Sequence, residues 1–250
     1  MEYIVGIDEA GRGPVLGPMV YACAGWPTSL DSEYSKLGFA DSKTINEEKR
    51  ENFFETIKKL DEVVYEVEVI TSKVISNSML SRTKTSLNTL STNAAKNLIK
   101  KLLDKGVNVK YVFVDTVGRP EAYEKQLSEE FPGLEFTVRP KADSLFAVVS
   151  AASICAKVTR DSYIKEMSQT LGKIGCGYPS DPNTRKWLSE SIDPVFGLPE
   201  DYVRVSWQTC TNLYLEKCIK VAWEKPKEFF KVAKNYYLEE FLCLTSKNPF

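Results

Sequence analysis

Four acidic residues stand where the pattern of the chain places strand ends. Asp8 and Glu9 close one apolar run, Asp115 closes a second, and Asp143 follows a third. Ligands gather at strand ends in α/β sheets, and a carboxylate beside a core is costly unless a positive charge compensates it. Any one of these acids alone fits a helix cap or a turn equally well. The convergence of all four predicts one shared site.

The chemistry open to this site is limited by the absence of histidine from all 250 residues. That absence excludes Ser-His and Cys-His nucleophiles, histidine general bases and histidine-ligated zinc. Clustered carboxylates instead favour a hard cation that prefers oxygen ligands, Mg²⁺ or Mn²⁺. Two such ions about 3.5–4 Å apart can activate water and stabilise both the scissile phosphate and the departing oxygen. The four acids therefore predict a divalent-metal-dependent nuclease.

A glycine-rich segment follows directly after the first acidic pair. Gly11, Arg12 and Gly13 have neither the spacing of a dinucleotide-binding turn nor the Gly-Lys-Ser/Thr of a phosphate-binding loop. Glycines let the backbone approach a ligand closely, and an arginine between them, beside an acidic site, indicates contact with a phosphate. A merely tight connection between two strands is the alternative.

Two further regions carry candidate substrate contacts. Ser153, Lys157 and Arg160 have the i, i+4, i+7 spacing of one helix face. If that helix begins at Asp143, the face extends from the acidic site and could follow a nucleic-acid backbone. Tyr178 lies in a loop rich in glycine and proline, where its ring could stack on a base or sugar. A solvated helix edge and a core aromatic are the ordinary alternatives.

Bulk composition is typical of a globular chain, with 43% hydrophobic and 27% charged residues, close to averages of about 45–50% and about 25%. The net charge of −1 gives no basic excess that would by itself indicate a nucleic-acid partner. The chain begins without the features of a secretory signal, and no apolar stretch approaches the roughly 20 residues that span a bilayer. We therefore expect an intracellular, soluble protein with no membrane contact.

The elements that must position these residues alternate between strands and helices after an opening hairpin. Period-two and apolar runs predict strands, and apolar residues at helical spacing predict helices. The expected strands are 3–8, 19–26, 63–70, 111–115 and 135–139, and the expected helices are 45–60, 87–102, 120–131, 143–167 and one beginning at 182. This order indicates an α/β fold with a mixed sheet. The pattern beyond Trp207 predicts a helical C-terminal appendage.

Six motifs, in family order, resemble those of type 2 ribonucleases H, the ribonuclease HII family, and within it the catalytic A subunits of eukaryotes. The motifs are Ile7-Asp8-Glu9-Ala10-Gly11-Arg12-Gly13-Pro14, Asp41-Ser42-Lys43, Val114-Asp115-Thr116-Val117-Gly118, Lys141-Ala142-Asp143, Ala152-Ser153-Ile154-Cys155-Ala156-Lys157 and Gly177-Tyr178-Pro179-Ser180-Asp181-Pro182. The similarity runs from residue 3 to about residue 208. It is far more specific than any single motif.

The resemblance implies a ribonuclease-H-like fold, a central mixed β-sheet flanked by helices. Residues 1–208 would form the catalytic domain and residues 209–250 a helical C-terminal extension. The implied activity is hydrolysis of the RNA strand of RNA/DNA hybrids and cleavage 5′ of single ribonucleotides embedded in duplex DNA. Water is the implied nucleophile, with two Mg²⁺ or Mn²⁺ ions when substrate is bound. Nuclear residence and two accessory subunits docked on the C-terminal region, a heterotrimer, are also implied.

The family's site carries over residue by residue. The implied metal ligands are Asp8, Glu9, Asp115 and Asp143. The implied reader of the ribose 2′-hydroxyl is the turn Gly11, Arg12 and Gly13, with Tyr178 sensing the RNA-to-DNA junction. The implied contacts near the substrate backbone are Lys43, Ser153, Lys157 and Arg160. Thr85-Ser86 departs from the Tyr-Asn that eukaryotic relatives commonly show, which leaves the contacts to the DNA strand there open.

Two other classes of protein remain as alternatives. A glycosidase also uses paired carboxylates, but it needs neither a metal nor an arginine-bearing glycine turn. A non-catalytic subunit could retain the fold without the activity. Loss of Mg²⁺-dependent cleavage on Asp8→Asn or Asp115→Asn would distinguish the three.

Overall fold

The computed structural model describes residues 1–39 and 45–220. Residues Met1–Cys218 form one compact unit. No helix in the two described ranges is long and apolar enough to cross a membrane.

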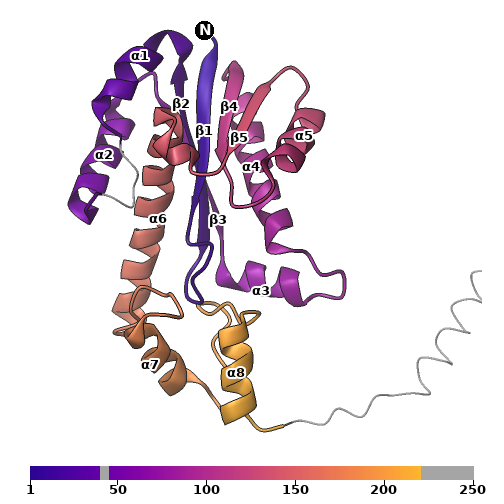
Figure 1. The fold of residues 1–250 in the computed structure, drawn as a ribbon. Coiled ribbons are helices and arrows are strands. Elements are labelled where there is room, and N and C mark those ends of the chain that lie inside the picture. Colours follow the sequence, from indigo (N-terminus) through magenta and orange to yellow (C-terminus); the bar gives the residue numbers. More distant parts are fainter. Residues whose placement is uncertain (40–44, 221–250) are drawn as a thin grey trace, which may run out of the picture. The chain divides into compact units, whose positions relative to one another are not determined.

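A five-stranded mixed sheet, in the order β3-β2-β1-β4-β5, is the centre of the described fold (Figure 1). β1 pairs antiparallel with β2, which confirms the predicted hairpin, and β2 pairs antiparallel with β3. β4 adds parallel to β1, and β5 adds parallel to β4. The bounds are β1 (Tyr3–Ala10), β2 (Met19–Pro27), β3 (Val64–Ile70), β4 (Val109–Asp115) and β5 (Glu135–Arg139). The predicted α/β fold with a mixed sheet is confirmed.

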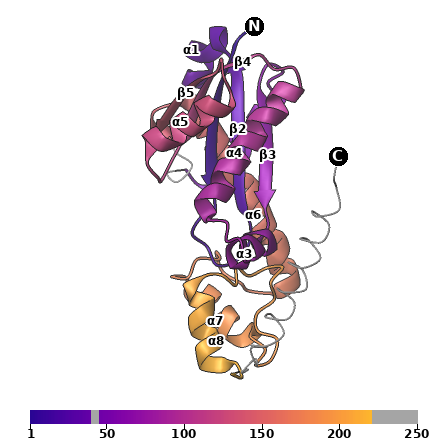
Figure 2. The same ribbon diagram turned by 90° about the vertical axis from the view of Figure 1, so that its right-hand side faces the viewer.

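Helices cover both faces of this sheet (Figures 1 and 2). Leu98 of α4 and Leu127 of α5 belong to the core on one face, whereas Ile57 of α2 and Val149 of α6 belong to the core on the other. The bounds are α2 (Glu47–Lys59), α4 (Leu87–Asp104), α5 (Pro120–Glu130) and α6 (Ala147–Leu171). Buried strands between two helical layers place the polar residues of the strand ends at the edge of a rigid frame.

Gly6 determines how closely α6 lies on β1. An ideal Cβ built at Gly6 would sit 2.2 Å from the backbone carbon of Val148. No side chain fits there, so the backbones of β1 and α6 come into direct contact. The next turns of α6 therefore lie beside the end of β1.

A third apolar cluster joins the connection after β1 to the C-terminal end of the described chain. Val15 and Leu16 pack there with Leu188 of α7 (Pro182–Ser191) and Cys210 of α8 (Gln208–Lys217). The packing of α8 into this cluster makes it part of the compact unit. Residues 221–250, most of the expected helical extension, lie outside the described residues, so the domain division at residue 208 stays a prediction.

The predicted start of the long apolar helix was wrong by four residues. Asp143 lies in a separate 3₁₀ turn, η3 (Ala142–Ser144), and α6 begins at Ala147. Lys141 before the turn has a left-handed backbone with φ 58°, and Phe146 after it is extended. An extended residue cannot continue a helix, so the face of Ser153, Lys157 and Arg160 does not extend from Asp143.

Several helices of the structure were not predicted. They are η1 (Thr28–Leu30), α1 (Asp31–Tyr34), η2 (Ser35–Leu37) and α3 (Ser72–Leu80). The first three are a single turn each, too short for apolar periodicity. For α3 the visible signal was the capping side chain of Thr71, which accepts a hydrogen bond from the N–H of Val74.

Candidate active site

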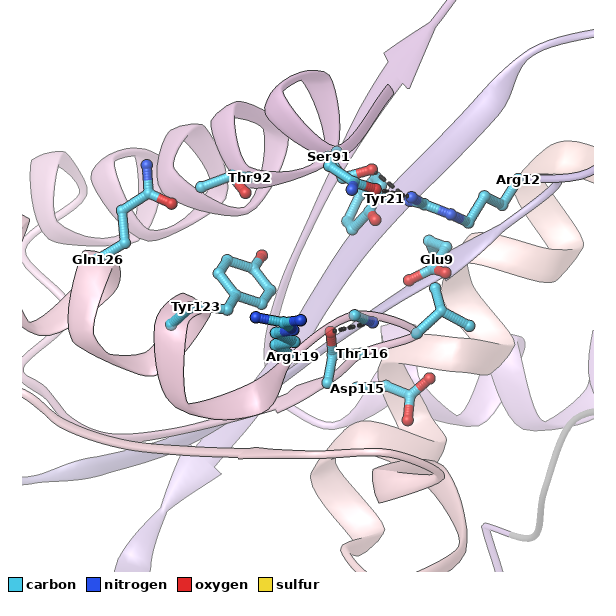
Figure 3. A pocket seen from close by; sticks show the side chains of 14 residues that line it. Glu9, Arg12, Tyr21, Ser91, Thr92, Asp115, Thr116, Arg119, Tyr123 and Gln126 are labelled. Carbon is cyan, nitrogen blue, oxygen red and sulfur yellow. Dashed lines mark hydrogen bonds between the residues drawn. The ribbon is translucent and has the colours of Figure 1, made fainter. Parts of the chain in front are cut away.

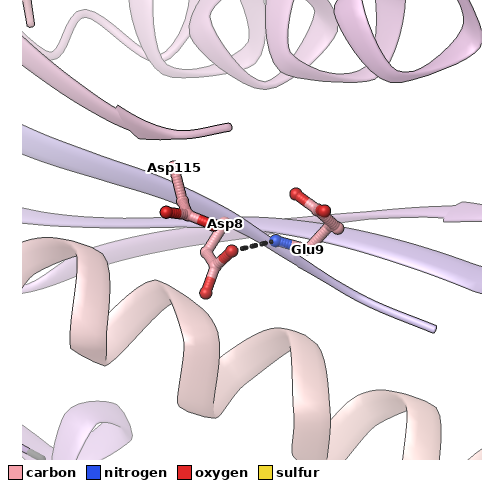
Figure 4. Close-up of side chains that lie close together, drawn as sticks. All are labelled: Asp8, Glu9 and Asp115. Carbon is pink, nitrogen blue, oxygen red and sulfur yellow. Dashed lines mark hydrogen bonds between the residues drawn. The ribbon is translucent and has the colours of Figure 1, made fainter. Parts of the chain in front are cut away.

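Three of the predicted acids converge at the strand ends. Among the described residues, Asp8, Glu9 and Asp115 each offer a carboxylate oxygen within 4.8 Å of the other two (Figure 4). Asp8 and Glu9 project to opposite faces of β1 because side chains alternate along a strand. Asp115 ends β4, where the parallel pairing of Val114 with Ile7 brings it beside Asp8. Sheet register therefore assembles a site from residues more than a hundred positions apart.

Asp8 is a buried carboxylate, 4% exposed, with like charges on both sides. Burial, followed by the charges of Glu9 and Asp115, raises the pKa of Asp8 well above its ordinary value. Hydrogen bonds from the side chain of Ser153 and from the N–H of Glu9, at 2.7 Å, act in the opposite direction. A cation among these oxygens would offset the repulsion, and a donor set of carboxylate oxygens alone suits Mg²⁺ or Mn²⁺.

Asp143, the fourth predicted acid, is 3% exposed and lies in η3 next to this cluster. The N–H of Ala142 donates to Oδ1 of Asp115 at 2.7 Å, which ties the turn to the end of β4. The hydroxyl of Ser150 donates to the backbone carbonyl of Asp143 and joins the turn to α6. The carboxylate of Asp143 does not belong to the group of three described above. Its role as a metal ligand stays a prediction.

The glycine turn is held from two sides. Gly11 has φ +79°, and an ideal Cβ there would lie 2.2 Å from Nε of Arg160, so both conformation and space require glycine. The guanidinium of Arg12 donates to Oγ of Ser91 at 2.6 Å and to the side-chain oxygen of Asn88, both on α4. Arg12 is therefore directed across the strand end into a fixed position.

Arg204, which the sequence did not indicate as a site residue, holds the glycine turn by hydrogen bonds to its backbone. Arg204 is 0% exposed, and its guanidinium donates to the carbonyls of Gly11 at 2.6 Å, Arg12 at 3.0 Å and Gly17 at 3.0 Å. Burial, and then the charge of Arg160, lowers the pKa of Arg204 to about 9, so the group still carries its proton at neutral pH. The sole signal in the sequence was an arginine between two valines.

The predicted face of α6 divides into three environments. Ser153 is buried against Asp8, whereas Lys157 forms an ion pair with Asp161 at 2.7 Å. Arg160 is buried beneath the loops, where it donates to the carbonyls of Leu16 and Cys176 at 3.4 Å. Burial lowers the pKa of Arg160. Lys43, the remaining predicted contact, lies outside the described residues.

Tyr178 lies beside the glycine turn with 41% of its surface exposed. A Cβ at Gly13 would be 3.4 Å from the nearest ring carbon of Tyr178. The carboxylate of Asp181 anchors this loop by accepting the N–H of Cys176 at 2.7 Å and that of Asn183 at 2.9 Å. These donors lower the pKa of Asp181 to about 2. The exposed ring is thus presented on a fixed loop next to the turn.

A pocket of about 450 Å³ opens beside the carboxylates (Figure 3). Glu9, Asp115 and Arg12 line one end of it, and Tyr21, residues 116–119 and residues of α4 and α5 line the rest. The departing sequence at Thr85-Ser86 lies at the start of α4, where Ser86 accepts the N–H of Thr89 as the helix cap. That cap orients the first turn of α4, which carries Asn88 and leads to Ser91.

Comparison with known proteins identifies one family. The family described as Ribonuclease HII matches residues 5–210. The A subunit of ribonuclease H2 from Homo sapiens is 46% identical over 248 residues, covering 95% of this chain and 82% of the relative. The corresponding A subunit from Arabidopsis thaliana is 49% identical over 227 residues, covering 88% and 76%. The crystal structure of ribonuclease H2 from Pyrococcus horikoshii superposes with a TM-score of 0.75 at 31% identity, covering 86% of this chain and 98% of that one.

The family match, the identity to curated relatives and the shared fold all point to the same assignment that the six motifs indicated. They also exclude the glycosidase alternative, because the matched family is one of nucleases. The chain belongs to the ribonuclease HII family and is a nuclease that hydrolyses phosphodiester bonds.

Proposed function

We propose that this chain hydrolyses the RNA strand of RNA/DNA hybrids and cuts 5′ of single ribonucleotides embedded in duplex DNA. The observation that carries the proposal is the convergence of Asp8, Glu9 and Asp115 beside a pocket lined by Arg12, in a chain of the ribonuclease HII family. A cation held by these acids would offset their repulsion of an anionic phosphodiester and could activate water against it. A cationic side chain at the same place then binds the flanking phosphate.

The proposal assigns the metal to the four carboxylates. Asp8, Glu9 and Asp115 would hold Mg²⁺ or Mn²⁺, and Asp143 would complete the set from η3. Bound there, two such ions would activate the attacking water and stabilise charge on the phosphate and on the leaving oxygen. The chain's own contribution is to orient the ligands: Ser153 fixes one oxygen of Asp8, and the N–H of Ala142 fixes Oδ1 of Asp115.

Selection of a ribonucleotide is assigned to the glycine turn and Tyr178. Gly13 is exposed and carries no side chain over its backbone, so this part of the turn can approach a 2′-hydroxyl closely, while the buried Gly11 fixes the conformation of the turn. Arg204 holds two of the turn's carbonyls, which fixes which way its peptide groups face. Tyr178 presents its ring to the sugar on the 3′ side of the cut.

The decisive experiment is cleavage of a DNA duplex that carries one ribonucleotide. We expect Mg²⁺-dependent cutting by the natural chain, none of an all-DNA duplex, and loss of activity to the EDTA background in Asp115→Asn. Asp104→Asn, an exposed acid at the far end of α4, is the matched control and should retain full activity. Full activity in excess EDTA, or in Asp115→Asn, would contradict the metal mechanism and would favour a site elsewhere.

Assembly and location form part of the same proposal. The curated relatives are named as A subunits of ribonuclease H2, which supports a complex of this chain with two accessory subunits in the nucleus. Purification of the tagged chain from its own cells, followed by native mass measurement, tests the assembly. A chain recovered as a monomer and imaged outside the nucleus would contradict both statements.

A further inference from the structure

The pocket beside the carboxylates continues past them between α4 and α5 (Figure 3). Thr92 of α4 and Tyr123 and Gln126 of α5 line this inner part, which no step of the proposed mechanism uses. The whole pocket has a volume of about 450 Å³, which lies within the range of about 300–1,000 Å³ that ligand sites occupy. The pocket therefore has room for a sugar-phosphate unit beside the carboxylates.

Arg119 supplies a cation at this pocket. It is the last residue of the connection from Asp115 and directly precedes Pro120, the first residue of α5. Thr116 fixes the connection by accepting the N–H of Gly118 at 3.1 Å. Within residues 1–39 and 45–220 the guanidinium of Arg119 makes no hydrogen bond or ion pair, although it is exposed and lines the pocket. An arginine in this state keeps its forked donors available for a phosphate.

Tyr123 provides a second, independent observation. Its hydroxyl is buried and has no hydrogen-bond partner among the described residues, and Figure 3 shows it pointing into the pocket. Burial raises the pKa of Tyr123, so the hydroxyl keeps its proton and acts as a donor. Buried polar groups are almost always satisfied in folded proteins. A hydroxyl left without a partner at the bottom of a pocket thus indicates an acceptor that arrives with a ligand.

We propose that this pocket is a subsite for the phosphodiester of the cleaved strand that neighbours the scissile one, with Arg119 as its phosphate ligand and the Tyr123 hydroxyl as a second donor. The inference rests on the proposed function, since it assigns a place to the same substrate. Arg12 and Arg119 line the same pocket as Glu9 and Asp115, and the two arginines stand apart from each other in it (Figure 3). Consecutive phosphates of one strand would then meet a cation, the acidic site and a second cation.

The test is a methylphosphonate scan of the substrate, in which each phosphodiester in turn is made neutral. In the natural chain we expect kcat/KM to fall about tenfold or more at one position adjacent to the cut, the loss of one charge-assisted contact. In Arg119→Gln the same position should give no further loss. The slope of log KM against log salt should also become shallower by about 0.9, the value of one phosphate on a duplex.

Matched variants separate this role from general effects. Lys125→Gln removes a charge from α5, the helix that follows Arg119. Lys125 is exposed and pairs with Glu129 at 3.8 Å, and its loss should leave the scan and the salt slope unchanged. Arg119→Lys should restore the slope. Tyr123→Phe should lower kcat/KM on the unmodified duplex, and it should reduce the further loss caused by neutralising the phosphodiester that depends on Arg119, but not the loss at other positions.

Two results would overturn the inference. In the first, Arg119→Gln loses as much kcat/KM as the natural chain at every neutralised phosphodiester. In the second, the loss that depends on Arg119 occurs only when a phosphodiester of the uncleaved strand is neutralised. Both can be recorded while the natural chain cuts the duplex normally, so the proposed function would survive. Failure of the natural chain to cut any ribonucleotide-containing duplex would instead reject the proposed function itself.

Discussion

Acidic and basic residues lie close together at the end of β1, but the surroundings of the acids differ from those of the buried arginines. The acids gather as like charges, and the mutual repulsion of Asp8, Glu9 and Asp115 contributes to the raised pKa of Asp8. The buried arginines are distributed among neutral acceptors, and Arg204 alone donates to three backbone carbonyls. Both groups of residues accept or donate hydrogen bonds within the protein. At Asp8, however, burial and the charges of Glu9 and Asp115 outweigh those hydrogen bonds and raise the pKa, whereas Arg204 keeps its proton at neutral pH.

This difference indicates that the acidic cluster has a catalytic role and that the buried arginines have a structural one. A cluster whose charges repel one another lowers the stability of the fold, and such a cluster persists where a ligand supplies the opposite charge. A guanidinium bound by carbonyls holds loops in register without needing a ligand. Substitutions in the two regions should therefore have opposite effects on activity and stability.

The largest effect is expected at Asp8. Asp8→Asn should reduce cleavage to the metal-free background, yet it should raise the melting temperature in metal-free buffer because a buried, repelled charge is removed. Mg²⁺ should then stabilise the natural chain and leave Asp8→Asn almost unchanged, since a ligand stabilises the state that binds it. Thermal melting with and without Mg²⁺ measures both. A lower melting temperature in metal-free Asp8→Asn would break the comparison.

At Arg204 the pattern should reverse, with stability lost first. Arg204→Gln removes donors from buried carbonyls, each worth about 1–3 kcal/mol when left unsatisfied, so the free energy of unfolding should fall by about 3 kcal/mol. Urea denaturation measures the loss. Arg185→Gln, on an exposed position of α7, is the control and should stay within about 0.5 kcal/mol. Equal stability of the two variants would mean that Arg204 does not hold the turn.

A smaller loss is expected at Gly11. Gly11→Ala forces an ordinary side chain into φ +79° and against Arg160, at a cost of about 1–3 kcal/mol. Gly118→Ala is the matched control, because its Cβ would meet nothing nearer than Oγ1 of Thr116 at 3.7 Å. Denaturation curves of the two variants, with cleavage of the single-ribonucleotide duplex beside them, give the measurement. A Gly11→Ala chain as stable and active as Gly118→Ala would remove the requirement for glycine in the turn.

Tyr178 should show the smallest effect and the most specific one. Stacking on one nucleotide is worth about 1–3 kcal/mol, so Tyr178→Ala should lower kcat/KM at a single embedded ribonucleotide by about tenfold. Duplex affinity and stability should change less, because the ring is already 41% exposed. Tyr178→Phe keeps the ring and should retain most of the activity. Parallel losses in cutting and affinity would show that the ring acts as a general contact.

Local pattern was enough to predict the sheet and much of the acidic cluster. Asp8, Glu9 and Asp115 follow apolar runs, and strands of a parallel pair end at the same edge, so convergence follows from strand order alone. The bounds of β3 and β5 were predicted within one residue, because alternation and short apolar runs are local signals.

What the sequence did not reveal depends on contacts between distant segments. Arg204 supports a turn nearly two hundred residues earlier, and no periodicity encodes that pairing. The partial exposure of Lys157 fits a solvated helix edge, but the burial of Arg160 required the loop that carries Cys176 to fold over it. The left-handed backbone of Lys141, which leads into the turn that carries Asp143, is likewise a tertiary feature rather than a preference of lysine.

Gly6 has no functional group, yet the site depends on it. Because the backbones of β1 and α6 touch there, a methyl group at position 6 would act as a wedge and lift the helix from the strand. Ser153 would then move away from Asp8, although neither residue had been altered. Substitutions at Gly6 should therefore inactivate the protein, although this residue has no reactive group. A mutational scan restricted to polar residues would overlook it.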